Sequence, residues 1–233
     1  MPDTAAEHHV PPPGAVCCRA AGERLWLLPG RALVWPRRRT LVIADPHFGK
    51  GGVFRRRGVP VPAGGTDADL QRLSLLLERT GAERLLVLGD FFHGRPEAGE
   101  PWLDRFTAWR QAHGALTVTV VAGNHDRHAG APDPAWALDW HHHPLAEPPF
   151  LLAHEPVAAP VSGYVLAGHL HPVWTLGGGG DRLRVPVFWF GASGGVLPAF
   201  GGFTGGMAVR PAPCDRLYAA GEEAVVDCGV SAR

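Results

Sequence analysis

The sequence predicts one α/β domain that contains two β-sheets. In the first half, apolar runs of strand length alternate with segments of helical periodicity. In the second half, short strand candidates follow one another between glycine and proline turns, and helical periodicity is nearly absent. Neither half contains a Pro/Ser-rich linker or an internal repeat. We therefore expect a flexible tail over residues 1–22 and a single domain over residues 23–233.

The first half begins with an expected hairpin and continues with strands that alternate with helices. Arg24–Leu28 and Ala32–Trp35 are short apolar runs on either side of a Pro-Gly pair, which favours a turn between two strands. Thr40–Ala44 is apolar almost throughout, as is typical of a strand buried on both faces. The glycine- and arginine-rich segment after it is interpreted as a loop. Further along we expect a helix over Asp67–Thr80, a strand over Arg84–Leu88, a helix over Trp102–His113 and a strand over Leu116–Val121.

The second half is expected to form mainly strands. Its apolar runs are short and are separated by glycine or proline, which favours tight turns over helices. The candidates are Phe150–Ala153, Tyr164–Ala167, Val185–Phe190, Met207–Arg210, Leu217–Ala220 and Ala224–Val226. The chain has 233 residues, of which 45% are hydrophobic, so it is long enough for one core of ordinary size.

Charge and composition exclude several classes of protein. Lys plus Arg and Asp plus Glu both number 22, so the net charge is zero and a basic coat for general nucleic-acid binding is excluded. No apolar run is long enough to span a bilayer, and residues 1–14 lack the apolar region of a secretory signal. The four cysteines show no CxxC spacing. We therefore expect a cytoplasmic protein with reduced thiols and no membrane partner.

Polar residues of the kinds that bind metal ions follow five of the expected strands. They are Asp45, His47, Asp90, Asn124, His154, His169 and His171. Open α/β folds bind ligands at the carboxyl ends of their strands, so we expect these side chains to converge. Carboxylate, amide and imidazole donors without thiolate favour manganese, iron or zinc. Because Asp90 stands midway along the series and a carboxylate has two oxygens, the sequence predicts a site for two divalent cations.

The order of these motifs, DxH, GDxxH, GNHD, an isolated histidine and GHxH, resembles the calcineurin-like metallophosphoesterase superfamily. The resemblance covers residues 41–171 and implies an αββα sandwich of two mixed β-sheets flanked by helices, with a dinuclear metal centre. It implies that one ion is held by Asp45, His47, Asp90 and His171, and the other by Asp90, Asn124, His154 and His169. It also implies that His125 protonates the leaving oxygen, while Asp126 orients the His125 imidazole and favours its protonated form.

A narrower resemblance covers most of residues 24–227. The segments ADPHFGK, FRRRGVPVP, GDFFHGR, GNHDRH, LAHEP, GHLHP and LPAFGGFTGG are similar to those of the PdeM-type phosphoesterases, the ligase-associated DNA-damage-response endonucleases of bacteria. This resemblance implies manganese-dependent cleavage of DNA phosphodiester bonds, with single-stranded DNA as the substrate, in DNA repair. It also implies a functional association with a DNA ligase and a helicase. Pro46 stands where leucine is commoner, but that position only spaces the ligands.

Other functions compete with this interpretation. The same metal site would serve a phosphatase or a phosphodiesterase of small nucleotides, and the neutral net charge mildly favours that alternative. A degenerate site on a binding scaffold is a third hypothesis, which the complete set of ligands disfavours. Residues 191–195 match the GxSxG motif of serine hydrolases, but Pro198 follows too soon for the helix that this motif requires.

Further basic and histidine residues lie near these motifs in the sequence. The candidates for binding substrate phosphates are Lys50, Arg55, Arg56 and Arg57, with a solvated basic turn as an equal alternative. His93 and His128 adjoin motifs and are candidates for lining the cleft. Residues 37–39 are interpreted as solvated surface, and the three histidines at 141–143 as a loop.

Overall fold

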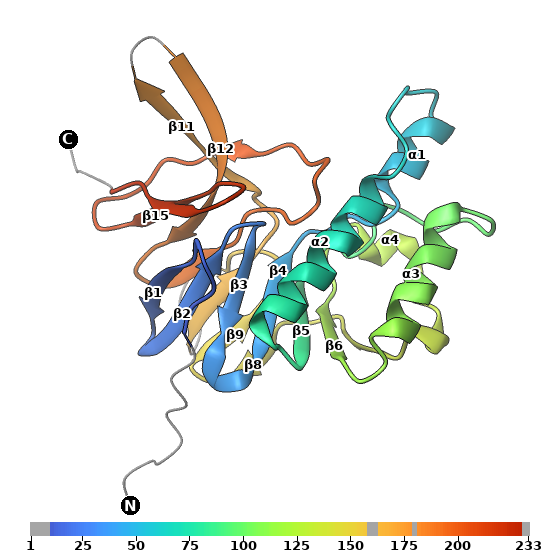
Figure 1. Ribbon diagram of the computed structural model, residues 1–233, viewed down its shortest axis with the longest axis horizontal. Helices are drawn as coiled ribbons and strands as arrows, with labels where there is room; N and C mark the ends of the chain where they lie inside the picture. Colours follow the sequence, from blue (N-terminus) through green and yellow to red (C-terminus); the bar gives the residue numbers. More distant parts are fainter. Residues whose placement is uncertain (1–9, 158–162, 179–180, 230–233) are drawn as a thin grey trace, which may run out of the picture.

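The computed structural model describes residues 10–157, 163–178 and 181–229. Its strands form two mixed β-sheets, and helices pack against the first of them (Figure 1). The predicted α/β class with two mixed sheets is therefore confirmed. None of the helices in these ranges has the length and apolar character that crossing a lipid bilayer requires.

Within the described ranges, seven strands form the first sheet in the order of the sequence. They are β1 (Val16–Ala20), β2 (Glu23–Leu28), β3 (Ala32–Trp35), β4 (Thr40–Ala44), β5 (Arg84–Leu88), β6 (Thr117–Val121) and β7 (Leu138–His141). Neighbouring strands from β1 to β4 run antiparallel, whereas those from β4 to β7 run parallel. The carboxyl ends of β4, β5 and β6 therefore meet at one edge of the sheet.

The second sheet is built from the later strands. They are β8 (Leu145–Glu147), β9 (Phe150–Leu152), β10 (Tyr164–Ala167), β11 (Pro172–Gly178), β12 (Asp181–Phe190), β13 (Gly194–Val196), β14 (Met207–Ala208), β15 (Arg216–Ala220) and β16 (Val225–Asp227). β9 and β10 pair in parallel, so their carboxyl ends also share an edge. β11 and β12 form an antiparallel hairpin whose outer part extends beyond the rest of the second sheet in Figure 1.

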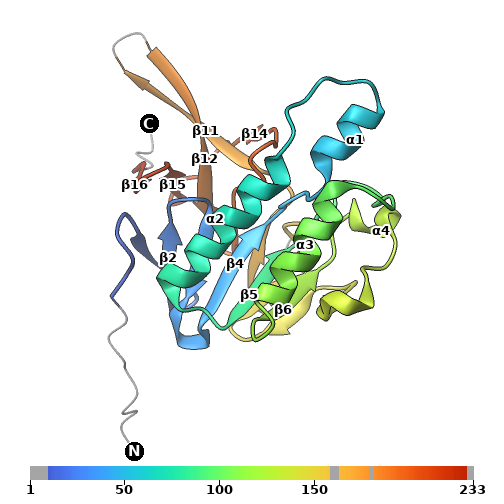
Figure 2. The same cartoon turned by 45° about the vertical axis from the view of Figure 1, so that its right-hand side comes forward.

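The helices follow the parallel strands of the first sheet. They are α1 (Lys50–Arg56), α2 (Gly65–Thr80), α3 (Pro101–Ala112) and α4 (Asp126–Ala129), with short 3₁₀ turns at Pro36–Arg38 and Pro134–Trp136. α2 and α3 lie side by side across one face of the first sheet (Figures 1 and 2). Leu70, Leu73 and Leu77 recur at helical spacing along α2 and share a buried cluster with Ile43 and Val87 of the sheet.

The other face of the first sheet packs against the second sheet. Val42 and Leu86 share a buried cluster with Phe150 and Phe188, and burial of each such side chain contributes about 1.5–3 kcal/mol to stability. On the far face of the second sheet, apolar strand residues are joined by Val209 from an irregular segment. No α-helix follows α4 in the described ranges, so these residues do not form the second helical layer of the expected αββα sandwich.

Main-chain contacts join the two halves of the chain at the edge where the polar residues gather. The Phe200 N–H donates to the Ala44 carbonyl at 2.7 Å, directly at the end of β4. Ala44 and Ala199 also form an isolated parallel bridge. These contacts place the glycine-rich segment 201–206 beside the residues that follow β4.

Residues 16–20 form a strand, so the prediction of a flexible tail over residues 1–22 is wrong there. The main chain of β1 pairs along its whole length with β2, and Cys18 and Ala20 are buried in the cluster between the sheets. Because buried and exposed residues alternate in β1, no continuous apolar run marks this strand in the sequence. Residues 1–9 of the predicted tail lie outside the described ranges.

The segment after β4, which the sequence pattern predicts to be a loop, contains α1. Gly51 and Gly52 each lower the propensity for a helix by about 1 kcal/mol, so the sequence pattern alone does not predict one. Contacts with distant residues favour it instead, since Phe54 stacks on His93. Strands β7, β8, β11 and β13 are likewise additional to the predicted elements, because they are defined mainly by pairing with their neighbours.

Candidate active site

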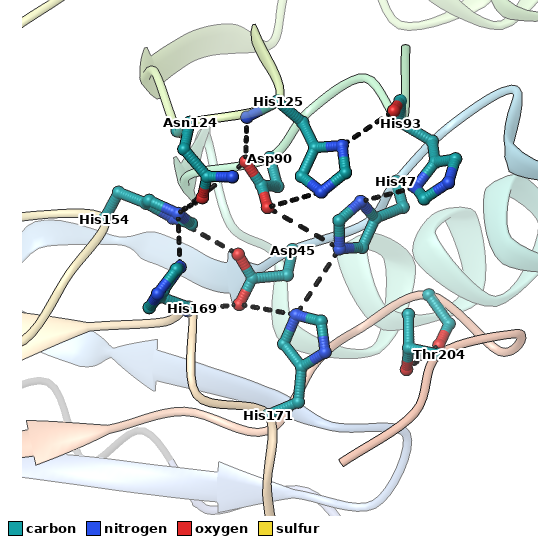
Figure 3. Close-up of polar contacts among 12 residues, drawn as sticks. Asp45, His47, Asp90, His93, Asn124, His125, His154, His169, His171 and Thr204 are labelled. Atoms are coloured by element: carbon teal, nitrogen blue, oxygen red, sulfur yellow. Dashed lines mark hydrogen bonds and ion pairs between the residues drawn. The ribbon is translucent and has the colours of Figure 1, made fainter. Parts of the chain in front are cut away.

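The seven residues predicted to bind metal converge at one place in the structure. They come from the loops that follow β4, β5 and β6 in the first sheet and β9 and β10 in the second (Figure 3). Direct contacts of 2.7–3.7 Å connect them into one cluster. The predicted convergence at the carboxyl edge of the sheets is thus what the structure shows.

Five of these seven residues have a left-handed backbone conformation. They are Asp45 (φ 48°), His47 (φ 48°), Asp90 (φ 38°), His169 (φ 67°) and His171 (φ 45°). This conformation costs a residue other than glycine about 1–3 kcal/mol, and such strain is concentrated at functional sites. The backbone at these strand ends is therefore locally unfavourable, and the contacts among the converging side chains must stabilise it.

Three glycines leave room for the ligands to approach one another. Gly89, Gly123 and Gly168 each directly precede one of the predicted ligands, and a Cβ atom at each would overlap a ligand from a different loop. The overlapped groups are the His154 ring at Gly89, the Asp90 carboxylate at Gly123 and the Asp45 carboxylate at Gly168. The close packing of the cluster thus depends on residues without a side chain.

One group of donors surrounds the buried His154 ring. His154 Nε2 lies 2.8 Å from Asn124 Oδ1, 3.0 Å from His169 Nδ1 and 3.6 Å from Asp90 Oδ1. These four residues are the set that the family resemblance implies for one ion.

A second group lies on the other side of Asp90. His47 Nε2 lies 3.4 Å from His171 Nε2 and 3.7 Å from Asp90 Oδ2. His171 Nε2 in turn lies 3.6 Å from Asp45 Oδ2. The two oxygens of Asp90 therefore face different groups, which is the arrangement expected of a carboxylate that bridges two ions.

The cluster fits a metal centre better than a network of hydrogen bonds. Asp45 Oδ1 and His154 Nδ1 are buried 3.3 Å apart, yet neither makes a hydrogen bond of acceptable geometry. Elsewhere three pairs of imidazole nitrogens face each other at 3.0–3.4 Å, although each neutral ring has only one N–H for its two nitrogens. Cations of the manganese, iron or zinc type would satisfy both kinds of atom, since the donors are nitrogen and oxygen without thiolate.

Burial and nearby charges shift the pKa values of the site residues in different directions. Burial lowers the pKa of His47 strongly and that of His93 to about 4, so both rings are neutral and offer lone pairs. Burial also lowers the pKa of His154, but the nearby carboxylates of Asp45 and Asp90 outweigh it and raise the pKa. Burial raises the pKa of the Asp90 carboxyl group, because it disfavours the charged form. Bound cations would stabilise the ionised carboxylates that burial disfavours.

His125 lies at the open side of the cluster. Its Nδ1 is 2.8 Å from the His93 carbonyl oxygen, so Nδ1 carries a hydrogen that it donates there. Its Nε2 is 4.0 Å from Asp90 Oδ2, and 38% of its side chain is exposed. The imidazole is therefore held by one nitrogen and presents the other to the site and to solvent.

The prediction that Asp126 orients the His125 imidazole is wrong. The buried Asp126 carboxylate accepts hydrogen bonds from the main-chain N–H groups of Phe91, Phe92 and Gly123, at 3.1, 2.8 and 2.8 Å. Burial raises its pKa to about 6, although these hydrogen bonds oppose the shift. Asp126 thus joins the loops that carry Asp90 and Asn124. The His93 carbonyl takes the orienting role, which no motif could reveal because every residue has a carbonyl.

The four basic residues predicted to bind substrate differ in their surroundings. The charge of Lys50 lowers the pKa of His47, so it lies close to the metal ligands. Arg55 donates to the Pro62 carbonyl, and Arg56 forms ion pairs with two glutamates. Arg57 is exposed at the end of α1. Lys50 therefore lies beside a predicted metal ligand, and Arg57 lies near His93, whose pKa its charge lowers.

The remaining candidates divide between the site and the surface. His93 Nδ1 lies 3.3 Å from His47 Nδ1, which places His93 in the cluster as the sequence suggested. His128 is exposed, and His141 ends β7 beside Asp139. Ser193, in the GxSxG match, is followed by β13 and not by a helix, in agreement with the rejection of that motif.

Comparisons with known proteins agree with this geometry. The family model described as calcineurin-like phosphoesterase matches residues 38–191. The solved structure of the Pseudomonas putida nuclease MPE is similar at 40% sequence identity and a TM-score of 0.80, with 91% of this chain and 99% of that chain covered. A search of curated proteins gave no significant match.

Proposed function

Because the chain belongs to the calcineurin-like phosphoesterase family and is a metal-dependent hydrolase of phosphoester bonds, we propose that it is a manganese-dependent nuclease that cleaves single-stranded DNA. The observation that carries this proposal is the convergence of seven nitrogen- and oxygen-donor residues in two groups around Asp90. The nuclease title of a structure that is similar over almost the whole chain supports nucleic acid as the substrate.

The two donor groups support an assignment of residues to two ions. We propose Asp45, His47, Asp90 and His171 for one and Asp90, Asn124, His154 and His169 for the other. Bound there, two divalent cations would lower the pKa of a water between them and neutralise charge on the phosphoryl oxygens. Manganese is proposed because mixed nitrogen and oxygen donors suit it and because the motifs resemble those of manganese-dependent relatives.

His125 is proposed as the proton donor for the leaving oxygen. The His93 carbonyl accepts the Nδ1 hydrogen, so Nε2 is directed to the open side of the cluster, where substrate must enter. A proton held at Nε2 can pass to the departing sugar oxygen, which is a poor leaving group without one. Asp126 acts only as a positioning residue in this scheme, since it fixes the loops of Asp90 and Asn124.

The biological setting follows from the motif resemblance. We propose that the nuclease acts in the cytoplasm, in DNA repair, and in functional association with a DNA ligase and a helicase.

A substrate panel tests the proposed activity. With manganese present, turnover of single-stranded DNA should exceed that of duplex DNA, of a cyclic dinucleotide and of p-nitrophenyl phosphate. Preference for p-nitrophenyl phosphate would establish a phosphatase instead, and preference for the cyclic dinucleotide would establish a small-nucleotide phosphodiesterase. Asp90→Asn should remove activity on every substrate, which guards against a contaminating nuclease.

A further inference from the structure

A cavity of about 420 Å³ adjoins the metal ligands. It lies between α1, the first turns of α2 and α3, and the segment 201–204. His47 lines this cavity and is also one of the predicted metal ligands, so the cavity borders the ligand cluster. A molecule whose phosphate reaches the ions can therefore place an adjoining group in the cavity, and the volume is in the range of small-molecule sites.

Apolar and backbone atoms shape much of the cavity. Trp102 and Phe203 line it together with the glycines of α1 and of the turn before α2. Gly49, with φ 80°, lies so close to the Trp102 indole that any Cβ atom there would overlap it. Gly49 therefore keeps the start of α1 close to Trp102 at this wall of the cavity.

Phe203 stands at the edge of this cavity with its ring open to solvent. Phe203 is 51% exposed, and no other Phe, Tyr or Trp residue in the described ranges is exposed. Full burial of such a ring contributes about 1.5–3 kcal/mol, and the exposed half of Phe203 forgoes about half of that. Phe203 and Thr204 are the two residues of the segment 201–206 that are not glycine, so Phe203 is the large apolar side chain that this segment presents.

Phe203 also ends a row of rings that begins in the metal site. The rings of His125 and His93 are stacked at 4.8 Å, and those of His93 and Phe54 are stacked at 5.6 Å. Phe54 meets Phe203 edge to face at 5.7 Å. Ring contacts therefore lead from the proposed proton donor to Phe203 at the edge of the cavity.

A positive charge accompanies these rings. Lys50 Nζ lies 5.8 Å from the ring centre of Phe203 and 5.9 Å from that of Phe54. A ligand that uses both features has a flat ring and an anionic group a short distance apart. Within a phosphoesterase site, a nucleotide with an unpaired base meets this description, because its base can stack while its phosphate faces the ammonium group.

We propose that Phe203, supported by Phe54, stacks against the base of the nucleotide next to the scissile phosphate, and that Lys50 contacts the phosphate of that nucleotide. The inference rests on the proposed phosphodiesterase activity. It adds a contact to the base, which the metal ligands do not contact. Stacking on one aromatic face is tolerant of base identity but requires that the base be unpaired. The arrangement thus gives a physical reason for preferring single strands over duplexes.

Three small diesters with the same leaving group isolate the contribution of the base. They are thymidine 5′-(p-nitrophenyl phosphate), thymidine 3′-(p-nitrophenyl phosphate) and methyl p-nitrophenyl phosphate. For at least one thymidine ester, Phe203→Ala should lower kcat/KM about 10- to 100-fold more than for the methyl ester, as expected for the loss of one stacked base. Phe203→Trp should restore the preference for the thymidine ester, whereas Phe203→Leu, which is apolar but not aromatic, should not.

The control variant is Leu75→Ala, which removes an equally exposed apolar side chain from α2 and should leave all three rates unchanged. Equal losses on the thymidine and methyl esters for Phe203→Ala would overturn the stacking proposal. The two proposals fail separately: a wild-type enzyme that hydrolyses the esters but not single-stranded DNA contradicts the nuclease function, whereas the ratio between esters still decides the role of Phe203.

Discussion

The inner part and the rim of the site are built on different principles. The inner part is defined by Asp45, Asp90 and His154, whose side chains are at most 5% exposed. The rim is defined by Lys50, His125 and Phe203, of which His125 and Phe203 are 38% and 51% exposed. Positive φ angles and close glycines hold the inner residues in place, whereas a few ring and hydrogen-bond contacts hold the rim.

This difference indicates a division of labour. Residues that bind ions must keep their positions within a narrow range, and the strain at Asp45 and Asp90 is retained for that reason. Residues that meet the substrate must be reachable, and they are accordingly exposed. We therefore expect changes in the inner part to affect all substrates alike, and changes at the rim to discriminate between them.

The largest effect is expected from Asp90→Asn. It removes the charge that both donor groups share, so activity should fall below detection on single-stranded DNA and on p-nitrophenyl esters alike. Steady-state rates with manganese measure this. Retained activity on any one substrate class would place Asp90 outside the common part of the site.

The next largest effect is expected from His125→Ala, and it should depend on the leaving group. Loss of the proton donor should lower kcat/KM about 10²- to 10⁴-fold on DNA, but much less on bis(p-nitrophenyl) phosphate, whose leaving group barely needs a proton. His128→Ala, an exposed histidine in the same segment, is the matched control and should behave as wild type. Equal losses on the two substrates would assign His125 to the inner part instead.

Gly89→Ala tests whether the inner part depends on close approach. The new Cβ would overlap the His154 ring, and displacement of a ligand should lower activity about 100-fold on every substrate. Gly22→Ala has the same φ of 83° but meets no atom of the described residues within 4 Å. The control should therefore lose some stability and no activity, whereas similar activity losses in both variants would show that backbone strain alone is responsible.

A clear effect on stability, with a smaller effect on activity than the changes above, is expected from Asp126→Ala. Three buried main-chain N–H groups lose their acceptor, and each group left unsatisfied costs about 1–3 kcal/mol. Urea denaturation should show a markedly lower free energy of unfolding than for wild type. Asp133→Ala removes one exposed N–H acceptor and should cost far less; comparable losses would mean that Asp126 does not join the two loops as described.

The inner part was also the more predictable of the two from the sequence. Apolar strands such as Thr40–Ala44 end abruptly in polar residues, and parallel strands bring those ends together, so local pattern and topology suffice. The role of Asp126 could not be predicted, because its partners Phe91 and Phe92 are main-chain groups more than thirty residues away. The proposed role of Phe203 likewise depends on its tertiary contacts with Phe54 and Lys50, which the sequence does not reveal.

The same contrast holds for the fold. The buried strands of the first sheet have continuous apolar runs and were predicted within one residue. The edge strand β1 and the helix α1 were not, since alternation at Cys18 and two adjacent glycines respectively weaken the local signal. Contacts with other parts of the chain determine the conformation of β1 and α1, so the sequence of either segment alone does not predict it.

The central claim is that seven side chains hold a pair of cations, and the metal content of the protein tests it most directly. After loading with manganese and removal of excess metal, elemental analysis should give two ions per chain for wild type. Asp90→Asn should retain fewer, whereas Asp69→Asn, which alters a buried carboxylate paired with Arg72 outside the cluster, should retain both. A folded wild-type protein that binds no manganese, iron or zinc, or an Asp90→Asn variant that still holds two ions, would contradict the account.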